Sequence, residues 1–248
     1  MRIHARTASL AALLATACLG TAEPEDPVIA GKPVFFVGNS LTYFNDMPFM
    51  IAAFAEADGQ ESLGIGSLLV PDYSLEDHWT DGRALAEIRR GGWKVVVLQQ
   101  GPSSLPENQA LLAQWASRFA DEARAVGARP ALYMVWPEST RREAFDAVSA
   151  SYRGAAEAVD GLLFPVGEAW RAAWRRDPDA PLYADDGYHP SVAGSYLAAL
   201  VMYQQLYDRS PIGLPHALTL PIGRISVDSA LARILQEAAA EANAQFAR

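Results

Sequence analysis

Residues 33–42 read Pro33-Val34-Phe35-Phe36-Val37-Gly38-Asn39-Ser40-Leu41-Thr42, and the organisation of the chain can be worked out from this stretch. Residues 34–37 are β-branched or aromatic without a polar side chain, which is typical of a strand buried on both faces. Gly38 ends the run and permits a tight turn. Ser40 therefore follows a buried strand at the carboxyl edge of a sheet, where open α/β folds place their sites. From its position alone, Ser40 is either a helix cap or a nucleophile.

The rest of the chain alternates between strand and helix patterns, which predicts a mostly parallel sheet with helices on both faces. At 248 residues the chain suits one domain, or one domain with a tail. Residues 209–224 contain three prolines and are expected to be irregular. Asp46 is expected to cap the first long helix. Further strands are predicted at residues 61–70, 93–98, 130–136 and 162–166, and helices at residues 46–57, 75–90, 107–126, 139–159, 167–176, 190–207 and 226–246.

The first 22 residues are expected to be an export signal, because a basic start precedes a short apolar run that is rich in Ala and Leu. The single cysteine, Cys18, suggests a lipoprotein signal cleaved before it, although Ala15 departs from the usual leucine. The alternative is ordinary cleavage after Ala17 or Ala22. Residues 23–32 then form a linker and residues 33–248 the domain. We expect an exported protein, either anchored by lipid in the periplasm or cell envelope, or secreted.

The charge balance is acidic, with 20 Lys and Arg against 29 Asp and Glu and a net charge of −9. Because no cluster of basic residues appears, nucleic acid is not expected as a partner. A membrane is expected only through a lipid anchor at Cys18.

A second informative stretch, residues 182–191, comes after the last predicted strand and contains Asp186 and His189. A serine nucleophile needs a base within hydrogen-bond reach, and that base needs a group that holds its tautomer. His189 and Asp186 can supply both from one short loop at the edge of the sheet that carries Ser40. Alternatively, Asp185, Asp186 and His189 bind a metal, or His189 is a surface histidine.

These two stretches resemble the first and last conserved blocks of the GDSL, or SGNH, hydrolases, in the order in which that family has them. Residues 38–42 are similar to the Gly-Asp-Ser-Leu block, with Asn39 in the Asp place, and residues 186–191 are similar to the Asp-x-x-His block. The resemblance extends over residues 33–207. It implies a flavodoxin-like three-layer α/β/α sandwich with about five parallel strands. It also implies ester hydrolysis through an acyl-enzyme without metal or cofactor, with Ser40 as nucleophile, His189 as base and Asp186 as its partner.

The two middle blocks, which supply the family's oxyanion donors, diverge in this chain. Pro71-Asp72-Tyr73-Ser74 stands at the first, and Gln99-Gln100-Gly101 replaces Gly-x-Asn-Asp at the second. The chain is more similar to a branch of SGNH-like proteins that has Gly-Asn-Ser, Leu-Gln and Gly-Glu-Ala-Trp segments. Residues 166–170, Val-Gly-Glu-Ala-Trp, fit the last of these segments. We expect the oxyanion donors to be the N–H of Ser40, the side chain of Gln100 or Gln99, and the N–H of Ser74.

Asn39, Trp136 and Tyr188 are expected to line the substrate pocket, although Trp136 is equally well explained as a core residue. The leading functional hypothesis is an exported serine esterase that removes acetyl groups from a carbohydrate. The alternatives are a lipase or thioesterase, and a glycan-binding domain of the same fold that has lost turnover.

Overall fold

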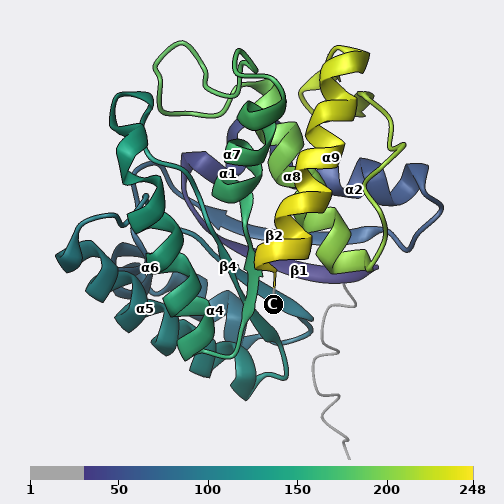
Figure 1. The fold of residues 1–248 in the computed structure, drawn as a ribbon. Coiled ribbons are helices and arrows are strands. Elements are labelled where there is room, and N and C mark those ends of the chain that lie inside the picture. Colours follow the sequence, from purple (N-terminus) through teal and green to yellow (C-terminus); the bar gives the residue numbers. More distant parts are fainter. Residues whose placement is uncertain (1–30, 248) are drawn as a thin grey trace, which may run out of the picture.

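The computed structural model describes residues 31–247 (Figure 1). The expected export signal, with Cys18, and residues 23–30 of the expected linker lie outside the described residues. Lys32, which we expected to end the linker, is the first residue of strand β1.

Five strands form one sheet in the order β2-β1-β3-β4-β5, and every neighbouring pair is parallel. This order is that of flavodoxin-like folds, so the expected fold class is confirmed. The strands are β1 (Lys32–Gly38), β2 (Leu63–Leu69), β3 (Val95–Leu98), β4 (Arg129–Tyr133) and β5 (Leu162–Phe164).

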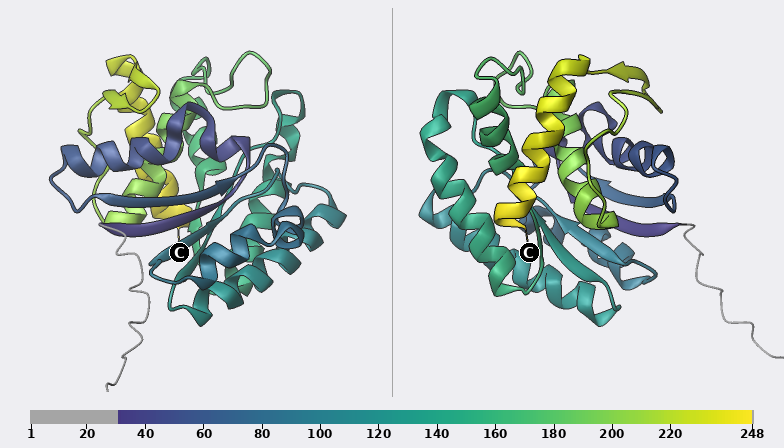
Figure 2. Two further views of the ribbon diagram at one scale, coloured as in Figure 1. Left: turned by 180° about the vertical axis from the view of Figure 1, so that it is seen from behind. Right: turned by 45° about the vertical axis from the view of Figure 1, so that its right-hand side comes forward.

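Helices cover both faces of the sheet and make the outer layers of a three-layer sandwich (Figure 1, Figure 2). Helices α2, α8 and α9 lie on one side, and α4, α5 and α6 lie on the other. Their bounds are α1 (Ser40–Tyr43), α2 (Met47–Ala57), α3 (Leu75–Asp81), α4 (Arg83–Arg89), α5 (Pro106–Ala125), α6 (Phe145–Ala158), α7 (Val166–Arg176), α8 (Val192–Tyr207) and α9 (Ser229–Phe246), with 3₁₀ segments η1 (Phe44–Asp46) and η2 (Ser139–Ala144).

The apolar runs seen in the sequence become the centre of the sheet. Val34 to Val37 in β1 and Val96 to Leu98 in β3 are at most 2% exposed, because helices cover both faces of these two strands. Burial on this scale is the main favourable term in folding. Burial of these runs also fixes where β1 and β3 end, and therefore places Gly38 and Gln99 at the carboxyl edge of the sheet.

Two expected helices are interrupted. The helix predicted over residues 75–90 is two helices, because Gly82 has a φ of +80° and ends α3 before α4 begins. The helix predicted over residues 139–159 begins with the 3₁₀ segment η2, and α6 starts only at Phe145.

The segment expected to be irregular contains a hairpin. Strands β6 (Ala217–Leu220) and β7 (Gly223–Ser226) pair antiparallel in a separate two-stranded sheet. The hairpin also explains why Asp46 does not cap α2 as expected. Its carboxylate instead accepts a hydrogen bond from the N–H of Ile222, in the turn between β6 and β7, at 2.9 Å.

Within residues 31–247, no helix combines the length and the apolar composition needed to cross a bilayer.

Candidate active site

The turn that carries Ser40 is formed by residues immediately after β1. Asn39 has extended backbone angles and caps α1, its side-chain oxygen accepting from the N–H of Leu41 at 3.1 Å. Ser40 is the first residue of α1, so the cap position is filled by Asn39 and not by Ser40. The Asn39 amide also donates to the carbonyl of Tyr73 at 2.9 Å, which ties this turn to the loop after β2.

Gln99 lies beneath this turn and holds it with three hydrogen bonds from its side-chain amide. Its oxygen accepts from Asn39 N–H at 2.9 Å and from Thr42 Oγ1 at 2.8 Å. Its nitrogen donates to Asn39 Oδ1 at 2.9 Å and to the backbone carbonyl of the next residue, Gln100, at 2.7 Å. Both lone pairs and both hydrogens are therefore engaged, and the side chain is fully buried. The prediction that Gln99 donates to an oxyanion is wrong for this geometry.

The close approach of Gln99 also explains Gly38. A Cβ at Gly38 would lie 2.4 Å from Gln99 Oε1 and 3.1 Å from Thr42 Oγ1. Only glycine leaves room for the Gln99 amide under the turn.

The loop between α7 and α8 presents His189 and is organised by Asp186. One carboxylate oxygen of Asp186 accepts from the N–H groups of Tyr188 and His189, both at 2.9 Å. The other accepts from His189 Nδ1 at 2.5 Å. The hydrogen bond from His189, together with those from the two backbone N–H groups, lowers the pKa of Asp186 to about 2. The carboxylate is therefore ionised at neutral pH and fixes the tautomer with the proton on Nδ1.

The other ring nitrogen of His189 meets Ser40. His189 Nε2 lies 2.9 Å from Ser40 Oγ, and because Nδ1–H donates to Asp186, Nε2 accepts from the serine hydroxyl. The imidazole stacks on Phe44, with ring centroids 4.0 Å apart and an interplanar angle of 8°. The structure thus brings together the three residues that the sequence proposed from opposite ends of the domain.

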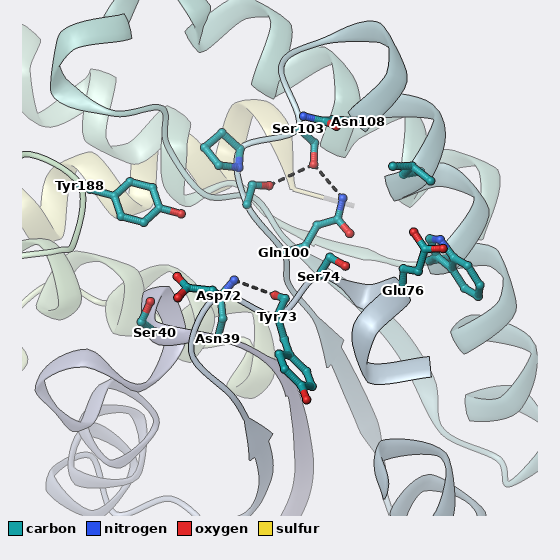
Figure 3. A pocket seen from close by; sticks show the side chains of 14 residues that line it. Asn39, Ser40, Asp72, Tyr73, Ser74, Glu76, Gln100, Ser103, Asn108 and Tyr188 are labelled. Carbon is teal, nitrogen blue, oxygen red and sulfur yellow. Dashed lines mark hydrogen bonds between the residues drawn. The ribbon is translucent and has the colours of Figure 1, made fainter. Parts of the chain in front are cut away.

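A cleft of about 280 Å³ opens beside Ser40 (Figure 3). Ser40 is only 5% exposed, but it is among the residues that line this cleft. Asn39 and Tyr188 also line it, as expected. The remaining lining residues are Asp72, Tyr73, Ser74, Glu76, Gln100, Gly101, Pro102, Ser103, Asn108, Leu111 and Trp115.

Trp136 does not line the cleft, so the core interpretation of this residue is the right one. It is fully buried and stacks on Trp170 with centroids 3.8 Å apart. Its indole nitrogen donates to the carbonyl of Tyr188 at 3.0 Å. Trp136 therefore supports the loop that carries His189 from below.

The other two predicted oxyanion donors, the N–H of Ser74 and the side chain of Gln100, donate their hydrogen bonds to other groups. The N–H of Ser74 donates to the Asp77 carboxylate at 2.8 Å, as part of the capping box of α3, which contradicts its expected role. The Gln100 side chain lines the cleft, but its nitrogen donates to Ser103 Oγ at 2.9 Å and is directed away from Ser40 (Figure 3). Its oxygen accepts from the N–H of Leu75 at 3.2 Å. For the N–H of Ser40, no acceptor lies within the described residues.

Sequence reasoning missed Phe44 and Asp72. Phe44 lies four residues after Ser40, a spacing that could have suggested contact with a partner of Ser40. Asp72 lies in the cleft because the loop after β2 ends at the same sheet edge as β1, a signal that was present in the strand order.

In the part of the chain that the structure describes, no group of three or more His, Cys, Asp or Glu is arranged to hold a metal ion.

Comparison with known proteins relies on structure, because no family model and no curated protein sequence matches the chain. A DUF4886 family protein from Bacteroides uniformis superimposes with a TM-score of 0.71 at 18% identity, over 86% of this chain and 95% of that one. A protein from Slackia heliotrinireducens, described as a candidate SGNH hydrolase, does so with a TM-score of 0.59 at 27% identity, over 69% and 97%.

An acetyl xylan esterase from Geobacillus stearothermophilus superimposes with a TM-score of 0.58 at 13% identity, over 73% of this chain and 96% of that one. The likenesses at 18% and 13% identity concern the fold, whereas the 27% identical neighbour also shares sequence over nearly its whole length. Together with the strand order, these neighbours show that the chain has the fold of the SGNH/GDSL hydrolases, and the 27% identical neighbour supports a place in that family.

Proposed function

We propose that the protein is a serine esterase that removes acetyl groups from a carbohydrate through an acyl-enzyme. One observation carries this proposal: Ser40 Oγ lies 2.9 Å from His189 Nε2, while Nδ1 of the same ring lies 2.5 Å from Asp186 Oδ2. A hydroxyl next to a base, with the base oriented by a carboxylate, is the arrangement that activates a serine nucleophile.

In the proposed reaction, His189 Nε2 takes the hydroxyl proton as Ser40 Oγ attacks the ester carbonyl. Asp186 stabilises the imidazolium that forms, and the stacked ring of Phe44 limits its rotation. The tetrahedral intermediate collapses, and His189 returns the proton to the departing alcohol oxygen. Water, deprotonated by the same nitrogen, then attacks the acyl-enzyme and releases the carboxylic acid and free Ser40.

The N–H of Ser40 is the proposed oxyanion donor. It is the first N–H of α1 and has no intrahelical acceptor, and it belongs to the residue whose Oγ attacks the carbonyl. Each oxyanion donor contributes about 10²–10³ in rate. Because Gln99 and Ser74 do not supply donors, we expect the enzyme to turn over slowly.

The cleft supports a small polar substrate. At about 280 Å³ it suits an acetyl group with one sugar ring better than a long acyl chain. Its lining is rich in amides, hydroxyls and carboxylates, which pair with sugar hydroxyls. The structural neighbour named as an acetyl xylan esterase is consistent with this substrate class.

Labelling with a fluorophosphonate tests the nucleophile. We expect the wild type to be labelled and Ser40→Ala to be unlabelled while its melting temperature stays the same. Ser104→Ala, a serine that does not line the cleft, is the matched control and should label like the wild type. Labelling that persists in Ser40→Ala, or is absent from the wild type, contradicts the proposed nucleophile.

Substrate profiling separates the proposal from its alternatives. Hydrolysis of 4-nitrophenyl esters that falls steeply from acetyl to octanoyl, together with release of acetate from acetylated oligosaccharides, supports the deacetylase. Faster hydrolysis of longer chains or of acyl thioesters supports a lipase or thioesterase. Glycan binding without Ser40-dependent turnover supports the binding domain, which the loss of the Gln99 and Ser74 donors favours.

We further propose that the protein is exported and meets its substrate in the cell envelope or the medium, from the basic and apolar pattern of residues 1–22. Metabolic labelling with a fatty acid, compared between wild type and Cys18→Ala, distinguishes a lipid-anchored form from a secreted one. Protein found only in the cytoplasm contradicts export.

A further inference from the structure

The cleft beside Ser40 carries charge of one sign. Its lining includes two carboxylates, Asp72 and Glu76, and none of its fourteen residues is a Lys or Arg. Two arginines come near without lining the cleft: Arg118 stacks over the ring of Trp115, a lining residue, at 4.5 Å, and Arg141 donates to Ser104 Oγ, outside the lining, at 3.3 Å. A substrate that enters the cleft therefore meets carboxylates without a lining cation to balance them.

The two carboxylates occupy different ends. Asp72 lies at the end that holds Ser40, and Glu76 lies at the far end (Figure 3). Asp72 is exposed, and its carboxylate has no hydrogen bond or ion pair with any described residue. Its charge reaches across the cleft, because the pKa of Tyr188 is raised by burial and further by the carboxylates of Glu138, Asp72 and Asp186.

The backbone at Asp72 shows that the carboxylate is not needed for the turn. The N–H of Tyr73 donates to the carbonyl of Val70 at 3.3 Å, and Asp72, at the third position of this turn, has a φ of +62°. Such positions favour Gly or Asn, which reach the left-handed region at lower cost. The local structure would be served at least as well by either residue, so what Asp72 adds is negative charge beside Ser40.

We propose that Asp72 selects substrates by charge: the site accepts uncharged or cationic esters and rejects esters with a negative charge near the reacting carbonyl. Among carbohydrates this favours acetylated neutral sugars or amino sugars over acetylated uronic acids or phosphorylated sugars. The inference rests on the proposed esterase function. A like charge a few ångströms away in a partly hydrated cleft corresponds to about a three- to tenfold loss in kcat/KM.

The test uses three acetate esters of similar size and shape: 4-acetoxybenzamide (neutral), 4-acetoxybenzoate (anionic) and 4-(aminomethyl)phenyl acetate (cationic). The variant is Asp72→Asn, which keeps the shape and the tolerance for positive φ but removes the charge. The readout is the ratio of kcat/KM for each charged ester to that for the neutral ester. Comparing this ratio between proteins cancels differences in the esters' reactivity.

Asp208→Asn is the matched control. Asp208 also has a positive φ, +53°, and its substitution changes the net charge by the same amount, but it ends α8 and does not line the cleft. We expect Asp72→Asn to raise the anionic-to-neutral ratio about three- to tenfold and to lower the cationic-to-neutral ratio. Asp208→Asn should change neither. Added salt should reduce the discrimination of the wild type more than that of Asp72→Asn, which keeps only the weaker effect of the other carboxylates.

The outcomes separate the two proposals. If both aspartate variants change the ratios equally, or neither does, charge selection by Asp72 is overturned while the esterase function stands. If the wild type shows no hydrolysis of the neutral ester that Ser40→Ala abolishes, the esterase function fails and charge selection fails with it.

Discussion

At the residue scale, the proposed chemistry depends on two short hydrogen-bonded units. Asp186 holds the backbone of its own loop with one oxygen and the imidazole of His189 with the other. Gln99 holds the turn before Ser40 with three side-chain hydrogen bonds and donates a fourth to the carbonyl of Gln100. Because each of these side chains is held by at least three hydrogen bonds, Ser40 and His189 face each other in a defined geometry before substrate arrives. Such pre-organisation is a large part of enzymatic rate enhancement.

Asp186→Asn is predicted to lower kcat by about 10³–10⁴, because the amide cannot stabilise the imidazolium and favours the wrong tautomer. Asp185→Asn, an exposed neighbour for which the structure records no partner, is the control and should retain wild-type kcat. The measurement is steady-state hydrolysis of a short 4-nitrophenyl ester. Equal kcat values for the two variants would contradict the role given to Asp186.

Asp186 is also predicted to affect stability in acid. Its pKa falls from 3.8 to about 2 in the folded protein. The unfolded chain therefore binds the proton more readily, and the contribution of Asp186 is complete above about pH 4 and lost as the pH falls towards 2. The melting temperature of the wild type should fall more steeply between pH 4 and pH 2 than that of Asp186→Asn. Parallel curves would show that the carboxylate is not stabilised as described.

At the element scale, the site is built where β1 and β3 end side by side. Gly38 and Gln99 follow the paired residues Val37 and Leu98, which places the Gln99 amide under the turn after β1. His78, on α3, reaches the same place: its Nε2–H donates to the carbonyl of Gly38 at 2.8 Å. The ends of two strands and one helix are therefore locked together beneath Ser40.

Gly38→Ala is predicted to destabilise the fold by about 1–3 kcal/mol and to reduce activity, because the new methyl group overlaps Gln99 Oε1. Gly154→Ala is the matched control. Gly154 lies inside α6 with open space around the added Cβ, so alanine there should be neutral or stabilise by up to about 1 kcal/mol. Chemical denaturation and ester hydrolysis measure both effects. A fully active, equally stable Gly38→Ala would contradict the packing under the turn.

His78 is predicted to make stability depend on pH near neutrality. Burial lowers its pKa below the ordinary 6.5, and its Nδ1 has no partner among the described residues. The unfolded chain therefore takes up a proton that the folded protein resists, so stability is complete above about pH 6.5 and decreases as the pH falls below it. In His78→Gln the loss of melting temperature from pH 8 to pH 5 should be smaller than in the wild type. An equal or larger loss would contradict a neutral, buried His78.

At the scale of the whole molecule, the site joins the first strand of the domain to a loop near its other end. Ser40 and His189 are 149 residues apart, and they meet because α2 packs on α8 across one face of the sheet. Asn45 fastens this junction, its side chain donating to the carbonyl of Pro190 at 3.0 Å and to Ser195 Oγ at 2.9 Å. Helix α9 covers α7 and α8 from outside and lines no part of the cleft.

Gln236→Leu is predicted to lower the free energy of unfolding by about 1–3 kcal/mol without changing kcat. Gln236 is buried in α9, accepts from the N–H of Gly213 and donates to Tyr196 Oη and to the carbonyl of Leu214, and leucine leaves these groups unpaired. Gln245→Leu, on the exposed side of α9, is the control and should change stability little. A loss of kcat at 25 °C in folded Gln236→Leu would show that α9 affects the site.

Much of this architecture follows from the sequence by itself. The apolar runs after Pro33 and after Trp93, and their alternation with helical patterns, determined a parallel α/β sheet, because burial on both faces requires uninterrupted apolar strands. Strand and helix order then placed Ser40 and the Asp186–His189 loop at one edge. Their hydrogen bonds were predictable because Asp186 and His189 lie in one turn and Ser40 directly follows a strand.

The tertiary structure alone decided the partners of the side chains between these two stretches. Gln99 and Gln100 are adjacent in sequence, yet one is saturated beneath Asn39 and the other lines the cleft, because successive side chains at a strand end point to opposite sides. Trp136 follows β4 at the same edge but is covered by Trp170 of α7. The hydrogen-bond partners of Gln99 and Gln100 and the burial of Trp136 depend on which element packs against each residue. The residue pattern of one segment does not show which segment packs against it. The turn at residues 38–42 was therefore recognised from the sequence, whereas what holds it and what charge faces it were decided by the fold.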